Sequence, residues 1–212
     1  MNLLDYPATL AFLVVNVFVS GYVFFVDPSS IEKLSFKPRA IVDRKEYYRF
    51  LSAGFVHGGF GHLAVNMLTL YFFGPYLEDL LGIWKYVALY FGSEIAAHAL
   101  TFYYRRNDPM YSAVGASGAI SGIVFAFCLF APFAMLGVMF FIPMPAILFA
   151  VLYTYGSIYM MKRAQAEGAS GVMGRIAHEA HLGGAIGGVL LTIMLEPKSL
   201  GIFIEQIMSV IR

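Results

Sequence analysis

Charged residues are scarce in this sequence. Only 13% of its 212 residues are Asp, Glu, Lys or Arg, whereas 59% are hydrophobic, and the mean hydropathy is +0.73. So little charge cannot cover the surface of a water-soluble protein of this size, and a membrane protein is favoured. The formal net charge of +1 lacks the basic excess typical of nucleic-acid-binding proteins, so we expect no nucleic-acid partner.

Cysteine is almost absent as well, because Cys128 is the only one in the chain. An intrachain disulfide is therefore excluded. The N-terminal segment lacks a basic stretch and a small-residue cleavage site, while residues 10–26 are nearly long enough to cross a bilayer. We expect this segment to be a retained first span rather than a cleaved signal peptide.

Apolar segments approaching the length of about 20 residues that a spanning helix needs recur along the chain. They predict a single domain over residues 1–212, an all-α polytopic bundle of six transmembrane helices, at residues 7–26, 57–81, 84–104, 114–131, 143–161 and 180–195. Between Pro132 and Pro143, residues 133–142 are expected to form an interfacial or re-entrant connection. Residues 162–175 are predicted to be a loop, and 200–211 a short surface helix.

The most unusual polar position is the serine of Gly115-Ala116-Ser117-Gly118, at the mouth of an apolar run. A serine in a membrane helix usually bonds to a backbone carbonyl, so Ser117 alone indicates little. Gly118 and Gly122 form a face of small residues. Gly184 and Gly188 form a second such face, which begins one turn after His181. Two such faces allow close approach of two helices, which would bring His181 near Ser117. A histidine at hydrogen-bond distance can take the serine proton during attack and return it to the leaving amine.

His62 and Asn66 lie four residues apart, and hence on one face of the predicted second span. Their side-chain N–H groups, together with the Ser117 amide, could stabilise the oxyanion of a tetrahedral intermediate. The alternative is that both residues hold neighbouring helices together by hydrogen bonds.

With these motifs, the chain resembles the rhomboid family of intramembrane serine proteases. The resemblance rests on Gly115-Ala116-Ser117-Gly118, on His62-Leu63-Ala64-Val65-Asn66, on Ala180-His181 with Gly184 and Gly188, and on Gly74, Glu78 and Gly82. It implies a six-helix core that cuts transmembrane protein substrates within the lipid bilayer, with a serine-histidine dyad and without a cofactor or metal. Ser117 would be the nucleophile and His181 the base, while His62, Asn66 and the Ser117 amide would line the oxyanion hole. Gly115 would permit a tight turn, and Glu78 would have a structural, hydrogen-bonding role.

The chain departs from the family pattern at several positions. Tyr48-Arg49 stands where many members have Trp-Arg, and we expect Arg49 to keep a structural role. Ser121 stands where some members place a tyrosine against the histidine, which leaves open what orients His181. Glu94 and His98 match no family chemistry, and hydrogen bonding with each other or between helices is expected of them.

Three alternatives remain open. His178-Glu179-Ala180-His181 is similar to a zinc-protease motif, but its histidines are three rather than four residues apart. A non-proteolytic rhomboid-like protein could bind membrane clients on the same scaffold, although it would be expected to lack the serine or the histidine. A transporter could use Glu94 and His98, but no repeat or pair of broken helices is evident.

The basic residues conflict with the usual family topology. All 14 lysines and arginines except Lys85, Lys198 and Arg212 fall on the side of the predicted serine, which the positive-inside rule places in the cytoplasm. Prokaryotic rhomboids generally open their sites to the exterior. We expect an integral multi-pass protein of the cell (plasma) membrane, with its orientation open. The resemblance also suggests that the fifth span and residues 162–177 regulate the access of substrates.

Overall fold

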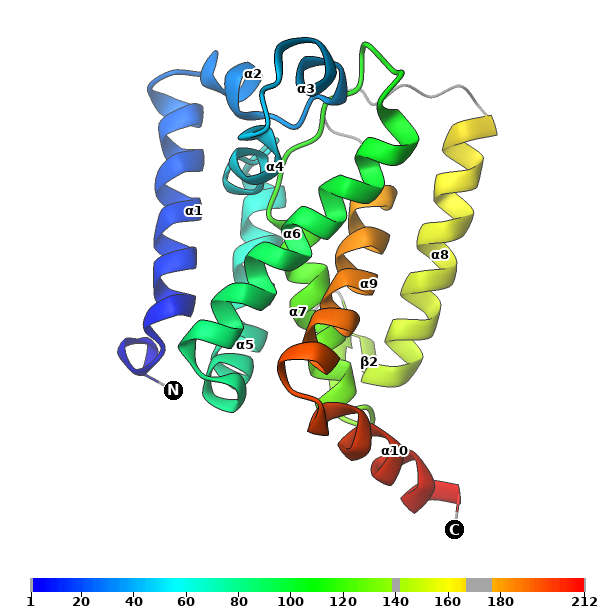
Figure 1. Ribbon diagram of the computed structural model, residues 1–212. Coiled ribbons are helices and arrows are strands. Elements are labelled where there is room, and N and C mark those ends of the chain that lie inside the picture. The colour runs from blue at the N-terminus through cyan, green and yellow to red at the C-terminus, as the bar shows by residue number, and fades with distance from the viewer. Residues whose placement is uncertain (1, 139–141, 167–176, 212) are drawn as a thin grey trace.

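The chain folds into a bundle of long helices, described in a computed structural model for residues 2–138, 142–166 and 177–211. The longer helices are α1 (Pro7–Phe25), α5 (Phe60–Leu81), α6 (Ile83–Arg105), α7 (Ser117–Phe130), α8 (Ala146–Ala166), α9 (His178–Leu195) and α10 (Lys198–Ile211). Between α1 and α5 lie the short helices α2 (Ser30–Leu34), α3 (Pro38–Arg44) and α4 (Arg49–Ser52). Figure 1 shows these short helices gathered over one end of the bundle.

The shortest of the central helices is α7, which packs against α6 and α9. Its 14 residues contrast with the 23 residues of α6. At a rise of about 1.5 Å per residue, α7 is therefore about 14 Å shorter than α6. The chain after α6 runs down beside the bundle before α7 begins, so the N-terminus of α7 lies inside the bundle rather than at its end (Figure 1).

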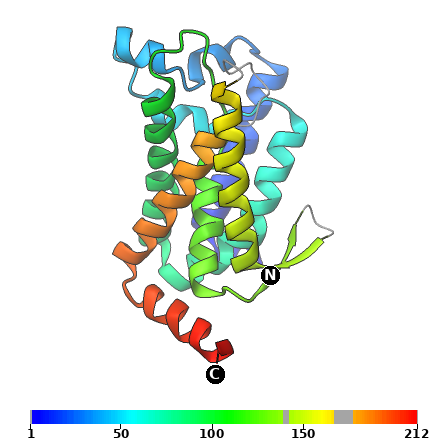
Figure 2. The ribbon, with the colours of Figure 1, turned by 90° about the vertical axis from the view of Figure 1, so that its right-hand side faces the viewer.

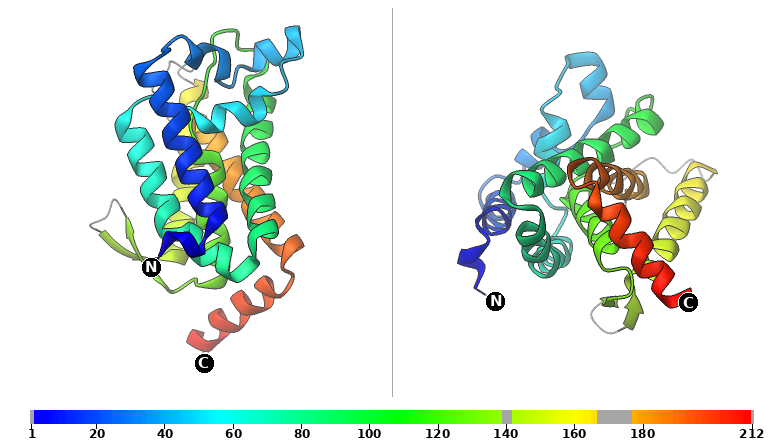
Figure 3. Two further views of the ribbon diagram at one scale, coloured as in Figure 1. Left: turned by 90° about the vertical axis from the view of Figure 1, so that its left-hand side faces the viewer. Right: turned by 60° about the horizontal axis from the view of Figure 1, so that its bottom comes forward.

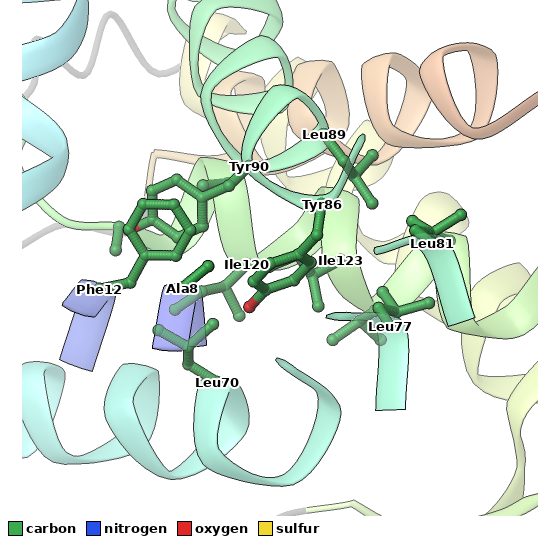
Figure 4. Close-up of a cluster of buried hydrophobic side chains, with 14 of the residues drawn as sticks. Ala8, Phe12, Leu70, Leu77, Leu81, Tyr86, Leu89, Tyr90, Ile120 and Ile123 are labelled. Carbon is green, nitrogen blue, oxygen red and sulfur yellow. The ribbon is translucent and has the colours of Figure 1, made fainter. Parts of the chain in front are cut away.

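The main hydrophobic core joins α1, α5, α6 and α7. Phe12 of α1 stacks on Tyr90 of α6 with ring centroids 3.9 Å apart, and Leu70 of α5 and Ile123 of α7 belong to the same cluster (Figure 4). Within it, the Thr9 hydroxyl donates a hydrogen bond to the Tyr86 hydroxyl oxygen over 3.2 Å. This core fixes α7 against the N-terminal half of the bundle.

Membrane-spanning potential differs among the described helices. By length and composition alone, α1 and α9 are long and apolar enough to cross a membrane, while α7 is a shorter apolar helix. α10 leaves the end of the bundle at an angle (Figures 1 and 3). Its exposed apolar side chains include Leu200, Ile204 and Met208. The structure thus has a helix over residues 200–211, where the sequence predicted one.

The link between α7 and α8 differs from the expectation of an interfacial or re-entrant segment. Residues Met135–Val138 (β1) and Ile142–Pro145 (β2) pair as antiparallel strands, with Leu136 opposite Met144. The pair projects from the side of the bundle (Figure 2). Pro143 and Pro145 favour extended backbone and delay the start of α8 to Ala146, three residues after the predicted start of that span.

The predicted loop at residues 162–175 also needs correction. α8 continues to Ala166, because residues 162–166 include good helix formers and contain no glycine or proline. The remainder of that loop lies outside the described residues. α9 begins at His178, two residues before the predicted span.

Candidate active site

Ser117, the candidate nucleophile, is the first residue of α7 and follows a tight turn. The backbone conformation of this turn at position 115 favours glycine. Gly115 has a φ of +118°, a conformation that L side chains rarely adopt. A Cβ at this position would also lie 2.6 Å from Nε2 of His62. Gly115 therefore provides both the turn and the space in which the His62 ring approaches the start of α7.

Ser117 and His181 lie side by side, although 64 residues separate them in the chain. The Ser117 Oγ is 2.8 Å from the His181 Nε2, which is hydrogen-bond distance. Both side chains are partly exposed rather than sealed in the core. The arrangement allows a proton to pass directly from the hydroxyl to the imidazole.

The glycines of α7 and α9 explain this approach. A Cβ on Gly184 would clash with the carbonyl group of Gly118, and a Cβ on Gly188 would clash with the backbone of Gly122. The two faces of small residues are thus in backbone contact, which sets the depth at which His181 meets Ser117.

The side chains proposed to bind the oxyanion are carried by α5, which packs against α7. Asn66 is buried, and among the described residues its Nδ2 has no hydrogen-bond partner. A buried donor without a partner is costly unless a ligand or water satisfies it. His62 is exposed and lies against Gly115, one turn before Asn66. In the described part of the chain, this face of α5 thus carries one buried donor without a partner and one exposed imidazole.

The amides at the start of α7 divide into occupied and open ones. The Ala116 N–H donates to the His57 Nε2 over 3.4 Å, and the Ala119 N–H donates to the Glu94 Oε2 over 2.9 Å. The Ser117 amide, in the first turn, has no intrahelical partner. It remains in place to donate to an oxyanion, assisted by the positive end of the helix dipole.

His57 is a residue of the site that the sequence reasoning missed. Its ring is fully buried, 2.9 Å from the Ser20 Oγ through Nδ1, and it meets the His62 ring edge-on at a centroid distance of 5.1 Å. It connects α1 to the start of α7. The available signal was a second histidine five residues before His62 in a chain that has only five histidines.

Glu94 and His98 support the start of α7 from α6. Besides accepting the Ala119 N–H, Glu94 lies 3.4 Å from the Nδ1 of His98. The His98 Nδ1 donates to the Phe50 carbonyl oxygen over 2.8 Å, and the ring stacks on Phe36. Mutual and interhelical contacts were expected of this pair; that Glu94 caps the helix of Ser117 was not.

A tyrosine does contact His181, but it comes from α8. The Tyr153 ring stacks on the His181 ring at 6.0 Å between centroids and 24° between planes. Its hydroxyl oxygen is 2.7 Å from the Oγ of Ser121. Ser121, four residues after Ser117, thus contacts the hydroxyl of Tyr153 rather than supplying an aromatic ring itself. The sequence pattern could not reveal which helix supplies the ring.

Two further residues singled out in the sequence make structural contacts. Glu78 of α5 accepts hydrogen bonds from the backbone N–H groups of Ala8 and Thr9 over 2.9 and 2.7 Å, and so caps the start of α1.

Arg49 is buried and donates to the Ser35 carbonyl over 2.6 Å and to Glu46 over 2.5 Å. Its guanidinium lies 5.3 Å from the centre of the Tyr48 ring. Hydrogen bonds from Arg44 and Arg49 lower the pKa of Glu46 to about 2.

The acidic residue of the motif His178-Glu179-Ala180-His181 forms an ion pair with another helix. Glu179 is buried and pairs with Arg105 of α6 at 2.5 Å. The His178 ring meets the His181 ring edge-on at 6.3 Å. This ion pair anchors the start of α9 to the end of α6, which is a structural use of the carboxylate.

Comparison with known proteins places this geometry in context. A family model described as the Rhomboid domain matches residues 44–198 of the chain, a range that contains both Ser117 and His181. "Rhomboid protein 1, mitochondrial" of Saccharomyces cerevisiae is 32% identical over 146 residues, covering 66% of this chain and 39% of that protein. "Putative rhomboid protease YdcA" of Bacillus subtilis is 37% identical over 79 residues, covering 37% of this chain and 38% of that protein.

"Rhomboid protease GluP" of the same bacterium is 25% identical over 175 residues, covering 82% of this chain and 31% of that protein. In each of these comparisons the chain spans about two fifths of the relative's length or less.

Proposed function

Because this chain belongs to the rhomboid family, and is therefore a polytopic helical membrane protein, we propose that it is an intramembrane serine endopeptidase. Its substrates would be transmembrane proteins cut in or near their spanning segments, in the cell (plasma) membrane. The observation that carries the proposal is the distance of 2.8 Å between the Ser117 Oγ and the His181 Nε2. Two residues from separate helices are held there by glycine contacts rather than by chance proximity.

The proposed reaction begins when a partly unwound substrate helix presents a carbonyl carbon to Ser117. The His181 Nε2 takes the hydroxyl proton as the Oγ–C bond forms, and the carbonyl oxygen becomes an oxyanion. The Ser117 amide, the Asn66 amide group and the His62 imidazole donate hydrogen bonds to it. A well-placed oxyanion donor is typically responsible for about 10²- to 10³-fold in rate.

Collapse of this intermediate breaks the peptide C–N bond, and His181 returns the proton to the leaving amine. A water molecule then attacks the acyl-enzyme with His181 again as the base. The start of α7 inside the bundle, below the short helices α2 to α4, supports this step, because the ester would lie in a protected but not sealed position. The partial exposure of Ser117 and His181 is consistent with water reaching it.

The experiment is cleavage of a reporter transmembrane helix by the purified chain in liposomes. We expect Ser117→Ala and His181→Ala each to abolish cleavage. Ser209→Ala serves as the matched control, because Ser209 is exposed on α10, where its hydroxyl donates to the Gln206 carbonyl. Binding of the reporter without cleavage by the parent chain would instead indicate a non-proteolytic client-binding protein.

A further inference from the structure

The catalytic base proposed above has an unusual environment. Among the described residues, no hydrogen bond is made to the Nδ1 of His181, so a third, acidic member does not hold its ring. The ring is instead bounded by Ser117 at Nε2, by the edge-on ring of His178, and by the face of Tyr153. Of these three contacts, the Tyr153 ring is the one that lies nearly parallel to the imidazole, and it therefore opposes rotation of the imidazole plane.

The hydroxyl of Tyr153 is itself held in place. Ser121 has one hydroxyl proton, which it donates to the Ser117 carbonyl oxygen over 2.7 Å. The Tyr153 hydroxyl must therefore be the donor in its 2.7 Å contact with the Ser121 Oγ. Phe149 and Phe125 flank the tyrosine ring at 5.4 and 5.5 Å. One closed circuit of contacts thus runs through Ser117, Ser121, Tyr153 and His181.

This circuit joins three helices, and one of them is peripheral. Ser117 and Ser121 lie on α7 and His181 on α9, both central, whereas α8 stands at the edge of the bundle (Figures 1 and 3). Around Tyr153, the side chains of Val151, Leu152 and Tyr155 are exposed. An outward displacement of α8 would withdraw the ring from His181 while leaving the contact between α7 and α9 unchanged.

We propose that Tyr153 is a positioning residue for His181, so that the dyad reaches its full activity only while α8 is docked against α7 and α9. This inference rests on the proposed function and adds that the base takes its orientation from α8. A substrate helix that displaces α8 would disorder the base, and redocking of α8 would restore it. The position of α8, the helix that borders the site, would thus also determine the orientation of His181.

The test compares turnover of the reporter helix with the rate constant of fluorophosphonate labelling at Ser117. For Tyr153→Leu, which removes the ring, we expect kcat and the labelling rate to fall by about 3- to 10-fold with KM unchanged, the range given by the worth of an aromatic pair. Tyr153→Phe keeps the stack and should recover most of the loss. Tyr155→Leu is the matched control on the exposed side of α8 and should behave as the parent chain does.

A second arm moves the ring to α7. In the double variant Ser121→Tyr with Tyr153→Leu, the aromatic ring would come from the turn after Ser117, and activity should rise above that of Tyr153→Leu alone. Parental kcat in a folded Tyr153→Leu, or an equal loss in Tyr155→Leu, would overturn the proposal. If Tyr153→Leu fails to fold, Tyr153→Phe is compared with the parent chain instead, and a folded Tyr153→Phe whose kcat has fallen by 3- to 10-fold or more would overturn the proposal. Activity that survives Ser117→Ala would instead refute the proposed function.

Discussion

The contact between α7 and α9 yields a prediction with two measurable parts. Gly184→Ala adds a Cβ that would lie 2.8 Å from the Gly118 carbonyl carbon and closer still to its oxygen. Carbon atoms in favourable contact are about 3.5 to 4.0 Å apart, so the helices must separate by about 1 Å. Overpacking of this kind destabilises a protein by about 1 to 3 kcal/mol.

The separation acts directly on the dyad, because His181 is one turn before Gly184. A shift of about 1 Å in a catalytic group can lower the rate by about 10²-fold. We therefore expect Gly184→Ala to lower cleavage of the reporter helix by about that factor. Thermal unfolding in detergent should show the loss of stability in the same sample.

Gly21→Ala is the matched control, since Gly21 also lies within a helix but its added Cβ would have nothing within 4 Å. Alanine is a better helix former by about 0.5 to 1 kcal/mol, so this variant should be as stable as the parent or more stable. A folded Gly184→Ala with labelling and cleavage within threefold of the parent would refute the claim that glycine contact sets the geometry of the dyad.

Three more predictions follow from individual contacts. Glu78→Ala removes the cap of α1 and should lower the free energy of unfolding by about 2 kcal/mol, measured by thermal or denaturant unfolding, with Glu78→Gln less severe. Asn66→Ala should slow reporter cleavage by about 10- to 100-fold, less than Ser117→Ala, because other donors remain; an equal loss would argue against shared oxyanion binding. In the folded protein the pKa of the Glu46 carboxyl is about 2, below its ordinary value of 4.5. Its ion pairs therefore stabilise the fold fully above pH 4.5, and this stabilisation is lost as the pH falls towards 2. The difference in free energy of unfolding between the parent chain and Glu46→Gln should shrink over that window and stay constant above it.

The residues that sequence reasoning brought together share a repeated spacing. Gly118 with Gly122 and Gly184 with Gly188 mark two helix faces by composition alone, so the meeting of α7 and α9 could be predicted. The proximity of Ser117 and His181 then followed from the position of each relative to its glycines. The lengths of the apolar segments likewise located the long helices to within a few residues.

The contacts that could not be predicted are those made by single side chains across helices. Tyr153 is one of 14 tyrosines, and nothing in its own neighbourhood distinguishes the one that stacks on His181. Glu94 caps α7 from another helix, so it leaves none of the local sequence signals of a cap. The strands β1 and β2 were missed because an apolar stretch between prolines does not distinguish a strand from a surface segment.

The central claim, that Ser117 is a nucleophile activated by His181, is tested most directly by covalent labelling. The detergent-solubilised chain is treated with a fluorophosphonate, and the modified residue is identified by mass spectrometry. We expect one adduct, on Ser117, that disappears in His181→Ala, while Ser209→Ala is labelled as the parent is. An unlabelled Ser117 in the folded parent, or labelling that persists undiminished in His181→Ala, would contradict it.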